Sequence, residues 1–152
     1  MNIRPATAED REAILALVPR LAQHGTPPGR DARQVAVTDL QAIAAVIDAR
    51  TAETQLLVAV HDRSIVGFIH VKTVTDYYTQ RPIGHISDIV VAPQAEGRGV
   101  GRALISAAEE WARSRGYTLM QLNVLVGNTA ARSLYEQLRY GAEWLKYVKP
   151  LS

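Results

Sequence analysis

One stretch decides how this chain is expected to fold, the run Val90-Val91-Ala92-Pro93-Gln94-Ala95-Glu96-Gly97-Arg98-Gly99-Val100-Gly101-Arg102-Ala103-Leu104. An apolar, β-branched segment enters a glycine-rich turn, and from Leu104 onward apolar residues recur at helical spacing. Glycine lets the backbone take positive φ, so successive N–H groups can gather at the positive end of a helix dipole. The stretch therefore predicts a strand, a turn and a helix arranged to bind an anion such as a diphosphate.

The glycine spacing restricts which phosphate ligand this turn can serve. Glycines stand at the alternate positions 97, 99 and 101, and no Gly-Lys-Ser/Thr sequence follows them, so the turn is not a Walker loop. It is not a dinucleotide fingerprint either, because Arg102 occupies the place of that motif's third glycine. Arg98 and Arg102 are placed to add phosphate contacts, although each is explained equally well as a surface cation. A tight turn that binds nothing is the plain alternative.

Two helices are predicted upstream of the long strands. After a short strand over 2–5, Thr7 is answered three residues later by Asp10, a capping pattern that begins a helix. The glycines and prolines of segment 25–29 end it. A second helix is predicted over 39–50, and the residues expected to point inward from it are Leu40, Ile43 and Ile47.

A change from helical to alternating periodicity marks the strands that follow. The runs 56–60 and 65–71 flank a polar turn over 61–64 and predict an antiparallel hairpin. Segment 73–82 has no clear period and predicts a loop, of the kind that often lines a substrate pocket. A further apolar strand is predicted over 85–91, and it stops at a proline.

After the glycine-rich turn the predicted elements alternate between helix and strand. Gly116 closes the helix, 119–126 returns as a strand, Asn128 caps another helix, and 142–148 supplies a last strand. Helices first, then a hairpin, then strand-helix-strand-helix-strand predicts an α/β or α+β fold with helices packed on a sheet. The length of 152 residues fits a single domain over 1–152.

Composition removes several classes of site. The chain has no cysteine, which excludes disulfides, zinc-thiolate sites and a covalent acyl-cysteine intermediate. The four histidines, His24, His61, His70 and His85, lie far apart, so no metal site is expected. A net charge of +2 without a basic run gives no reason to expect nucleic-acid binding. No signal peptide and no run of about 18 apolar residues is present, which predicts no membrane segment and a cytoplasmic location.

At this point the chain resembles the GCN5-related N-acetyltransferase (GNAT) superfamily. The family signature Gln/Arg-x-x-Gly-x-Gly/Ala falls on Glu96-Gly97-Arg98-Gly99-Val100-Gly101, and its Asn-x-x-Ala-x-x-x-Tyr segment falls on Asn128 to Tyr135. The leading position is Glu96 instead of Gln or Arg, which weakens a side-chain contact to phosphate there while leaving the backbone amides available. Arg139-Tyr140 replaces the usual Gly-Phe after the last helix. The resemblance covers nearly the whole chain.

The resemblance implies a mixed, mostly antiparallel sheet of about six to seven strands flanked by about four helices, with splayed central strands. Acetyl-coenzyme A would lie between the fourth and fifth strands, without a metal, and a homodimer is compatible with the family. The residues implied to bind the coenzyme are Ile89, Val90, Val91, Glu96, Gly97, Arg98, Gly99, Val100, Gly101, Arg102, Asn123, Asn128 and Tyr135. Asn128 is explained almost as well by helix capping.

The implied reaction moves an acetyl group directly from the thioester to a primary amine of a small molecule, peptide or protein. A departing thiolate needs a proton donor, for which Tyr135 is the candidate, and an ordinary amine needs a base or anchor, for which Asp88 is the candidate. Spacing alone favours Tyr135 as an aromatic at the edge of the core, and it is the surrounding family motif that favours the proton donor. His85, Tyr77 and Tyr78 are weaker candidates. Two other readings stay open, a non-catalytic acyl-coenzyme A sensor and a nucleotide-binding protein.

Overall fold

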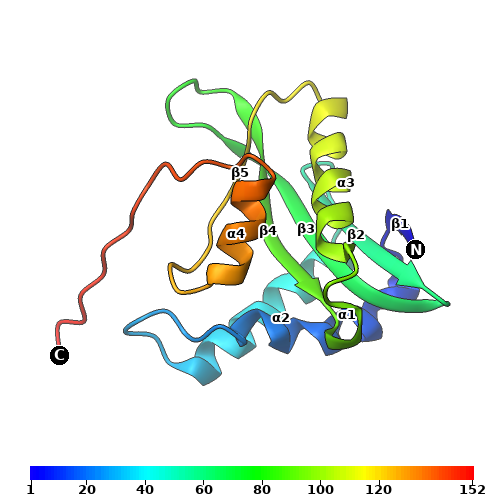
Figure 1. Cartoon of the computed structure of the whole chain (residues 1–152), viewed down its shortest axis with the longest axis horizontal. Coiled ribbons are helices and arrows are strands. Elements are labelled where there is room, and N and C mark those ends of the chain that lie inside the picture. The colour runs from blue at the N-terminus through cyan, green and yellow to red at the C-terminus, as the bar shows by residue number, and fades with distance from the viewer.

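Five strands form one sheet in the order β1-β2-β3-β4-β5 in the computed structural model, which describes residues 1–152 (Figure 1). The strands are β1 (Asn2–Pro5), β2 (Thr54–His61), β3 (Ser64–Thr75), β4 (Pro82–Val91) and β5 (Met120–Leu122). Every neighbouring pair is antiparallel except β4 and β5, which are parallel. The predicted α/β class with a mixed, mostly antiparallel sheet is therefore confirmed.

Four α-helices cover the two faces of this sheet (Figure 1). They are α1 (Arg11–Leu17), α2 (Ala32–Asp48), α3 (Val100–Ser114) and α4 (Thr129–Gln137). One core cluster joins α1 and α2 to the sheet around Phe68, and the other joins α3 to the opposite face around Leu104 and Ile69. Two layers of apolar side chains thus hold β4 from both sides. None of the helices has the length and hydropathy needed to cross a bilayer.

The first helical layer begins as the capping pattern predicts. Thr7 N–H donates to Asp10 Oδ2 at 2.7 Å, and a short 3-10 turn over Ala8–Asp10 leads into α1. The helix α2 starts seven residues before the predicted residue 39, because the Asp31 carboxylate accepts from Gln34 N–H at 3.0 Å and caps it. Leu40 is exposed, contrary to prediction, because only the second half of α2 is buried on the sheet.

The hairpin of β2 and β3 forms where it is predicted, and the loop after it is shorter than predicted. Asp62 and Arg63 take φ of 47° and 65°, which matches a tight turn between two twisted strands. The strands β3 and β4 extend to Thr75 and from Pro82, so the predicted loop over 73–82 shrinks to 76–81. The shorter loop is closed by Asp76 N–H, which donates to Arg81 O at 2.8 Å.

The sheet has five strands, slightly fewer than the six to seven predicted, because the predicted last strand has no partner; the strand before it is also shorter than predicted. Strand β5 pairs with β4 only from Met120 to Leu122 and then diverges, so 123–126 does not continue the predicted strand. The predicted last strand over 142–148 is absent, since no backbone hydrogen bond involves residues 141–152. An extended segment without a neighbour forms no ladder. Five strands remain.

Candidate active site

A cleft of about 620 Å³ opens where β4 and β5 separate. The two parallel strands share three residue pairs, Gly84 to Met120 being the first and Ile86 to Leu122 the last. Beyond that point the residues of β4 face the segment after β5 and the helix α4 across the cleft. The splay of the central strands follows directly from this short register, and it is the splay that the family resemblance implies.

The glycine-rich turn closes one end of this cleft. Gly97 and Gly99 take φ of 74° and 80°, a left-handed backbone that favours glycine. The first helical bond of α3 is donated by Ala103 N–H to Gly99 O at 3.0 Å, so the amides of residues 100–102 precede it and have no intrahelical acceptor. A Cβ on Gly101 would meet only ordinary contacts at 3.7 and 3.8 Å, so packing alone does not require glycine there. Three free amides at a helix N-terminus are suited to bind an anion.

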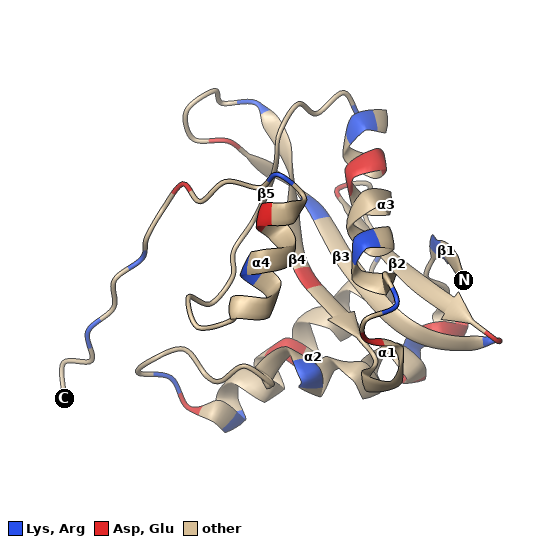
Figure 2. Ribbon diagram, viewed as in Figure 1, with Lys and Arg blue, Asp and Glu red and all other residues tan.

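Nearly all the residues predicted to bind the coenzyme lie along this cleft. The lining includes Ile89, Val90, Val91, Glu96, Gly97, Gly99, Val100, Gly101, Arg102, Asn123, Asn128 and Tyr135, together with the candidate Asp88. Arg98 does not line it; this residue connects the two left-handed glycines. The Arg102 guanidinium binds the Gln137 side chain of α4. Figure 2 shows basic positions at the start of α3.

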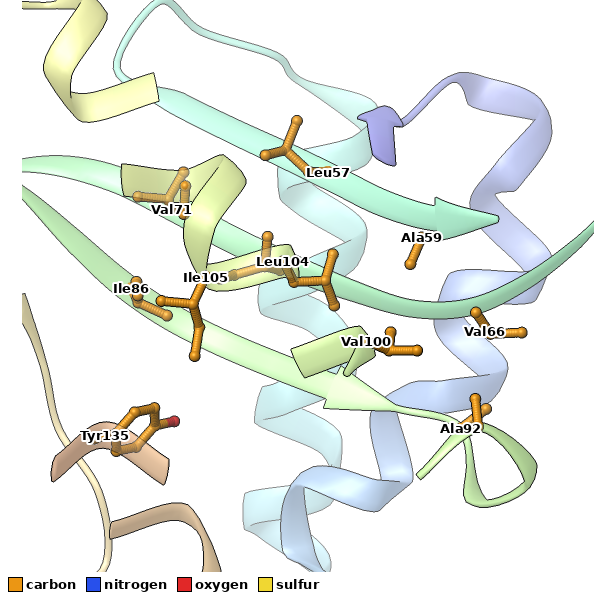
Figure 3. Packing of buried hydrophobic residues seen from close by; sticks show 13 residues of the cluster. Leu57, Ala59, Val66, Val71, Ile86, Ala92, Val100, Leu104, Ile105 and Tyr135 are labelled. Atoms are coloured by element: carbon orange, nitrogen blue, oxygen red, sulfur yellow. The ribbon is translucent and has the colours of Figure 1, made fainter. Parts of the chain in front are cut away.

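Tyr135 lies on α4 with its ring mostly buried at the edge of the core cluster (Figure 3). Burial raises the pKa of its phenol, which keeps the hydroxyl protonated at neutral pH. Tyr140 packs edge-on against it at 6.1 Å between ring centroids, and the Tyr140 hydroxyl donates to Glu109 Oε2 at 2.7 Å. Tyr135 therefore lines the cleft with a protonated hydroxyl on a ring that Tyr140 packs against.

Asp88 is held by His70, for which the sequence patterns predict no role. His70 Nδ1 lies 3.2 Å from Asp88 Oδ2, and the two residues are register partners on β3 and β4. A bulge next to this pair places Ser87 opposite no partner of its own, and it turns Asp88 and Ile86 to opposite faces. The atoms His70 Nε2 and Ser87 Oγ are buried without hydrogen-bond partners. The alternation from Phe68 to His70 was the available signal, since it places both side chains on one face.

A second carboxylate lies near Asp88 on the α2 side of the sheet. Burial raises the pKa of Asp39, and the negative charge of Asp88 raises it further. Asp39 does not line the cleft, so the cleft presents the Asp88 carboxylate and the paired Glu96 carboxylate, together with free N–H groups at the start of α3.

Glu96 departs from the family signature, and its negative charge is paired with a nearby arginine. The Arg20 guanidinium binds the Glu96 carboxylate, and Arg20 Nε donates to Val91 O at 2.8 Å. Both side chains line the cleft. Arg20 lies more than seventy residues before its partners, so no local pattern marks it. The negative charge at position 96 is therefore balanced beside the anion site.

The weaker candidates lie away from the cleft. His85 Nδ1 is 2.9 Å from Gln121 Nε2 in the paired part of β4 and β5, and burial lowers the pKa of its imidazole. Tyr77 and Tyr78 are exposed in the loop between β3 and β4. Asn128 lines the cleft, yet its Oδ1 accepts from Ala131 N–H at 3.2 Å, so only its side-chain NH₂ is free for a ligand. No three His, Asp or Glu side chains are grouped to hold a metal ion.

Comparison with known proteins agrees with this geometry. A sequence model of the acetyltransferase (GNAT) family matches residues 20–140. The chain is 32% identical to the uncharacterized N-acetyltransferase YhfO of Bacillus subtilis, over 92% of this chain and 89% of that protein. It is 25% identical to the aminoalkylphosphonate N-acetyltransferase of Salmonella typhimurium, over 99% of this chain and 91% of that protein. The crystal structure of a mutant BH1408 protein of Bacillus halodurans superposes with a TM-score of 0.81 at 21% identity, covering 100% of both chains.

Proposed function

Because the chain belongs to the acetyltransferase (GNAT) family, we propose that it transfers the acetyl group of acetyl-coenzyme A to a primary amine. In this proposal residues 1–152 form one N-acetyltransferase domain that acts in the cytoplasm, where acetyl-coenzyme A is its co-substrate. The observation that carries the proposal is the set of free amides at residues 100–102 at one end of a cleft that also holds Tyr135 and Asp88.

The donors along the cleft fit the parts of coenzyme A in order. The amides of residues 100–102 suit the diphosphate, because backbone N–H groups at a helix N-terminus favour negative charge. The backbone of β4 over 89–91 faces the cleft where β5 has diverged, so it can pair with the amide groups of pantetheine. Asn123 and the free NH₂ of Asn128 add donors on the opposite wall. This order brings the thioester toward Tyr135 and Asp88.

Asp88 is the residue proposed to act on the acceptor amine. An amine with a pKa near 10.4 is neutral in roughly one molecule per few thousand at pH 7, so it needs help to become a nucleophile. Asp88 anchors the ammonium and accepts its proton, with His70 holding the carboxylate in place.

Tyr135 is the residue proposed to protonate the leaving group. The amine nitrogen attacks the thioester carbon, a C–N bond forms, the C–S bond breaks, and the coenzyme departs as a thiolate. The Tyr135 hydroxyl gives its proton to that sulfur. Because the chain has no cysteine, no acyl-cysteine intermediate forms, and positioning of the two substrates supplies much of the acceleration.

A small primary amine is the proposed acceptor class. The support is the Asp88 carboxylate in the cleft and the similarity over nearly full length to an enzyme named for aminoalkylphosphonates, which are small molecules. Amino groups of peptides and proteins form the second class. A panel of both types ranks them directly.

Thiol release tests the proposal without background, because the protein itself carries no thiol. Acetyl-coenzyme A and an amine panel are supplied, and free coenzyme A is followed with a thiol reagent. Tyr135→Phe is expected to lower kcat by about 100-fold while leaving coenzyme A affinity unchanged. Tyr117→Phe is the matched control, since it loses one hydroxyl that lies 2.8 Å from Thr73 Oγ1 outside the cleft.

Two outcomes would remove parts of this account. Full turnover by Tyr135→Phe would remove the proposed acid. Binding of coenzyme A without turnover of any amine would instead indicate the non-catalytic sensor.

A further inference from the structure

The face of the sheet that packs against α1 and α2 becomes polar toward the start of β4. Phe68 and its cross-strand neighbours form an apolar row in the core. Side chains two residues further along β3 return to the same face, so the next row contains His70 and Asp88. The third row, which we call the polar row, belongs to neither core cluster and consists of the cross-strand neighbours Thr54, Lys72, His85 and Gln121.

The polar row is open to solvent and carries a lysine without a paired anion. Gln121 is exposed, and the other three side chains are half-buried. Lys72 is the only Lys or Arg of β3, and Asp88 is the only Asp or Glu of β4 (Figure 2). Lys72 forms no ion pair with a carboxylate of its own chain. Its ammonium group is therefore free to bind an anion.

His85 adds a neutral donor beside this lysine. The Gln121 side-chain amide donates from Nε2 to His85 Nδ1 at 2.9 Å, so the ring carries its proton on Nε2. Burial lowers the pKa of the imidazole, and the charge of Lys72 lowers it further, so the ring is neutral at pH 7. The Asp88 charge acts on the same imidazole in the opposite direction. All three groups thus lie within electrostatic reach of one another.

The bulge at Ser87 assembles this group. Without the shift in register, the apolar Ile86 would lie opposite Lys72, two residues after the pair of His70 and Asp88. The shift brings His85 there instead. An anion donor pair therefore lies next to the carboxylate that lines the cleft.

We propose that the acceptor carries an anionic group as well as its primary amine, and that Lys72 and His85 bind the anionic group while Asp88 binds the amine. This inference rests on the proposed acetyl transfer. Lys72 is a diagonal neighbour of Asp88 across β3 and β4, a relation in which two residues lie roughly 7–8 Å apart. An acceptor with a short carbon chain between its amine and a carboxylate or phosphonate spans that distance.

The same charges act against the other small amines. A diamine would place its second ammonium group beside Lys72, which repels it. An alkylamine would leave the lysine without an anion and gain nothing from it. The polar row therefore discriminates by attraction to one class of amine and by repulsion of another.

Three four-carbon amines test the proposal, since γ-aminobutyrate, butylamine and putrescine differ only at the end away from the reacting nitrogen. Aminopropylphosphonate is a second anionic probe. With acetyl-coenzyme A and detection of the released thiol, kcat/KM for the anionic amines should exceed that for butylamine by at least about 10-fold, with putrescine lowest. Butylamine or putrescine turned over as well as both anionic amines would overturn the proposal.

Variants of the polar row assign the preference to its residues. Lys72→Met should bring the ratio of kcat/KM for γ-aminobutyrate over butylamine close to one, and Lys72→Glu should favour putrescine over γ-aminobutyrate. His85→Phe should lower the ratio by about 3-fold, because a neutral donor is lost and the ammonium group stays. Arg63→Met is the matched control, since it removes an exposed positive charge from the turn before β3 and should keep the wild-type ratio. Coenzyme A affinity reports that each variant is folded. A wild-type ratio in Lys72→Met would overturn the assignment.

A binding measurement separates failure of the anion site from failure of the proposed reaction. Propylphosphonate, which has no amine to acetylate, is titrated by calorimetry into the full chain saturated with coenzyme A. Wild type should bind it at least about 10-fold more tightly than Lys72→Met does. Turnover of no amine, with this difference intact, would remove the reaction and keep the anion site. Equal binding by the two proteins would overturn the anion site whether or not amines are acetylated.

Discussion

The wall of the cleft formed by β4 and α3 and the wall formed by β5 and α4 are built differently. Strand β4 is ten residues long, pairs with β3 along its length, and has apolar layers on both faces. Strand β5 is three residues long and has a single neighbour. The amides that must be fixed in advance to bind a diphosphate lie on the first wall. The second wall carries the proposed acid Tyr135, whereas the proposed base Asp88 lies on β4 in the first wall. The outer edge of the second wall has no strand beside it.

The largest expected effect comes from breaking the first wall at Gly101. Gly101→Asp places a carboxylate among the free amides, where it competes with a diphosphate and repels it. Affinity for coenzyme A should fall by at least about 100-fold, or ~2.7 kcal/mol, measured by calorimetry. Gly101→Ala is the matched control, because its Cβ meets Leu134 and Val91 only at ordinary contact distances, and it should fold normally. Unchanged affinity in Gly101→Asp would contradict the assigned site.

Asp10 lies in the helical layer behind the first wall, and through it the free energy of unfolding should depend on pH. We expect no such contribution from the second wall. Arg4 and the Thr7 amide lower the pKa of Asp10 to about 2. Since the pKa is depressed on folding, the stabilisation is complete above about pH 4 and is lost as the pH falls through 2. Asp10→Asn should remove about 1–2 kcal/mol at pH 7 and flatten the denaturation profile between pH 4 and 2. A parallel pH profile for wild type and variant would exclude this role.

A smaller effect is expected from the ion pair of Arg20 and Glu96 beside the first wall. Arg20→Gln leaves the Glu96 carboxylate unbalanced beside the anion site, so coenzyme A affinity should fall by about 2- to 5-fold at low salt. Adding Glu96→Gln should restore it, because the uncompensated charge is then gone. Titrations of the two single variants and the double variant form a complete cycle. Additive losses would show that the two side chains act independently.

The smallest effect is expected on the stability of the second wall, at Arg139. Arg139 follows α4 with φ of 73°, a conformation that favours glycine, at the position where the family pattern has glycine. Arg139→Gly should therefore stabilise the fold by about 0.5 kcal/mol, seen as a slightly higher Tm with unchanged kcat. Gly141→Ala is the control, because Gly141 does not take positive φ. A lower Tm for Arg139→Gly would show that its side chain contributes more than the strain costs.

The features that the sequence predicted well have local signals. The glycines at 97 and 99 take the positive φ that the turn needs, Asn128 caps α4, and Asp62-Arg63 closes the hairpin, each through contacts within a few residues. The same local reading missed Asp31, the cap that starts α2 early. A carboxylate after a glycine- and proline-rich segment was the available signal.

The remaining features depend on contacts that no short pattern encodes. Arg20 reaches Glu96 across the fold, and His70 meets Asp88 only because a bulge sets their register. The segment 142–148 has the composition of a strand, but strand formation requires a neighbour that its own chain does not provide. Periodicity predicts which segments are able to form strands. Whether a segment does form a strand depends on a neighbouring strand with which it can pair.

The most direct test of the central claim compares coenzyme A with acetyl-pantetheine, which lacks the diphosphate and nucleotide. If the amides at the start of α3 bind the diphosphate, coenzyme A should bind at least about 100-fold more tightly in calorimetry, and Gly101→Asp should abolish most of that difference. Equal affinities for the two ligands, or a difference that survives in Gly101→Asp, would contradict the account.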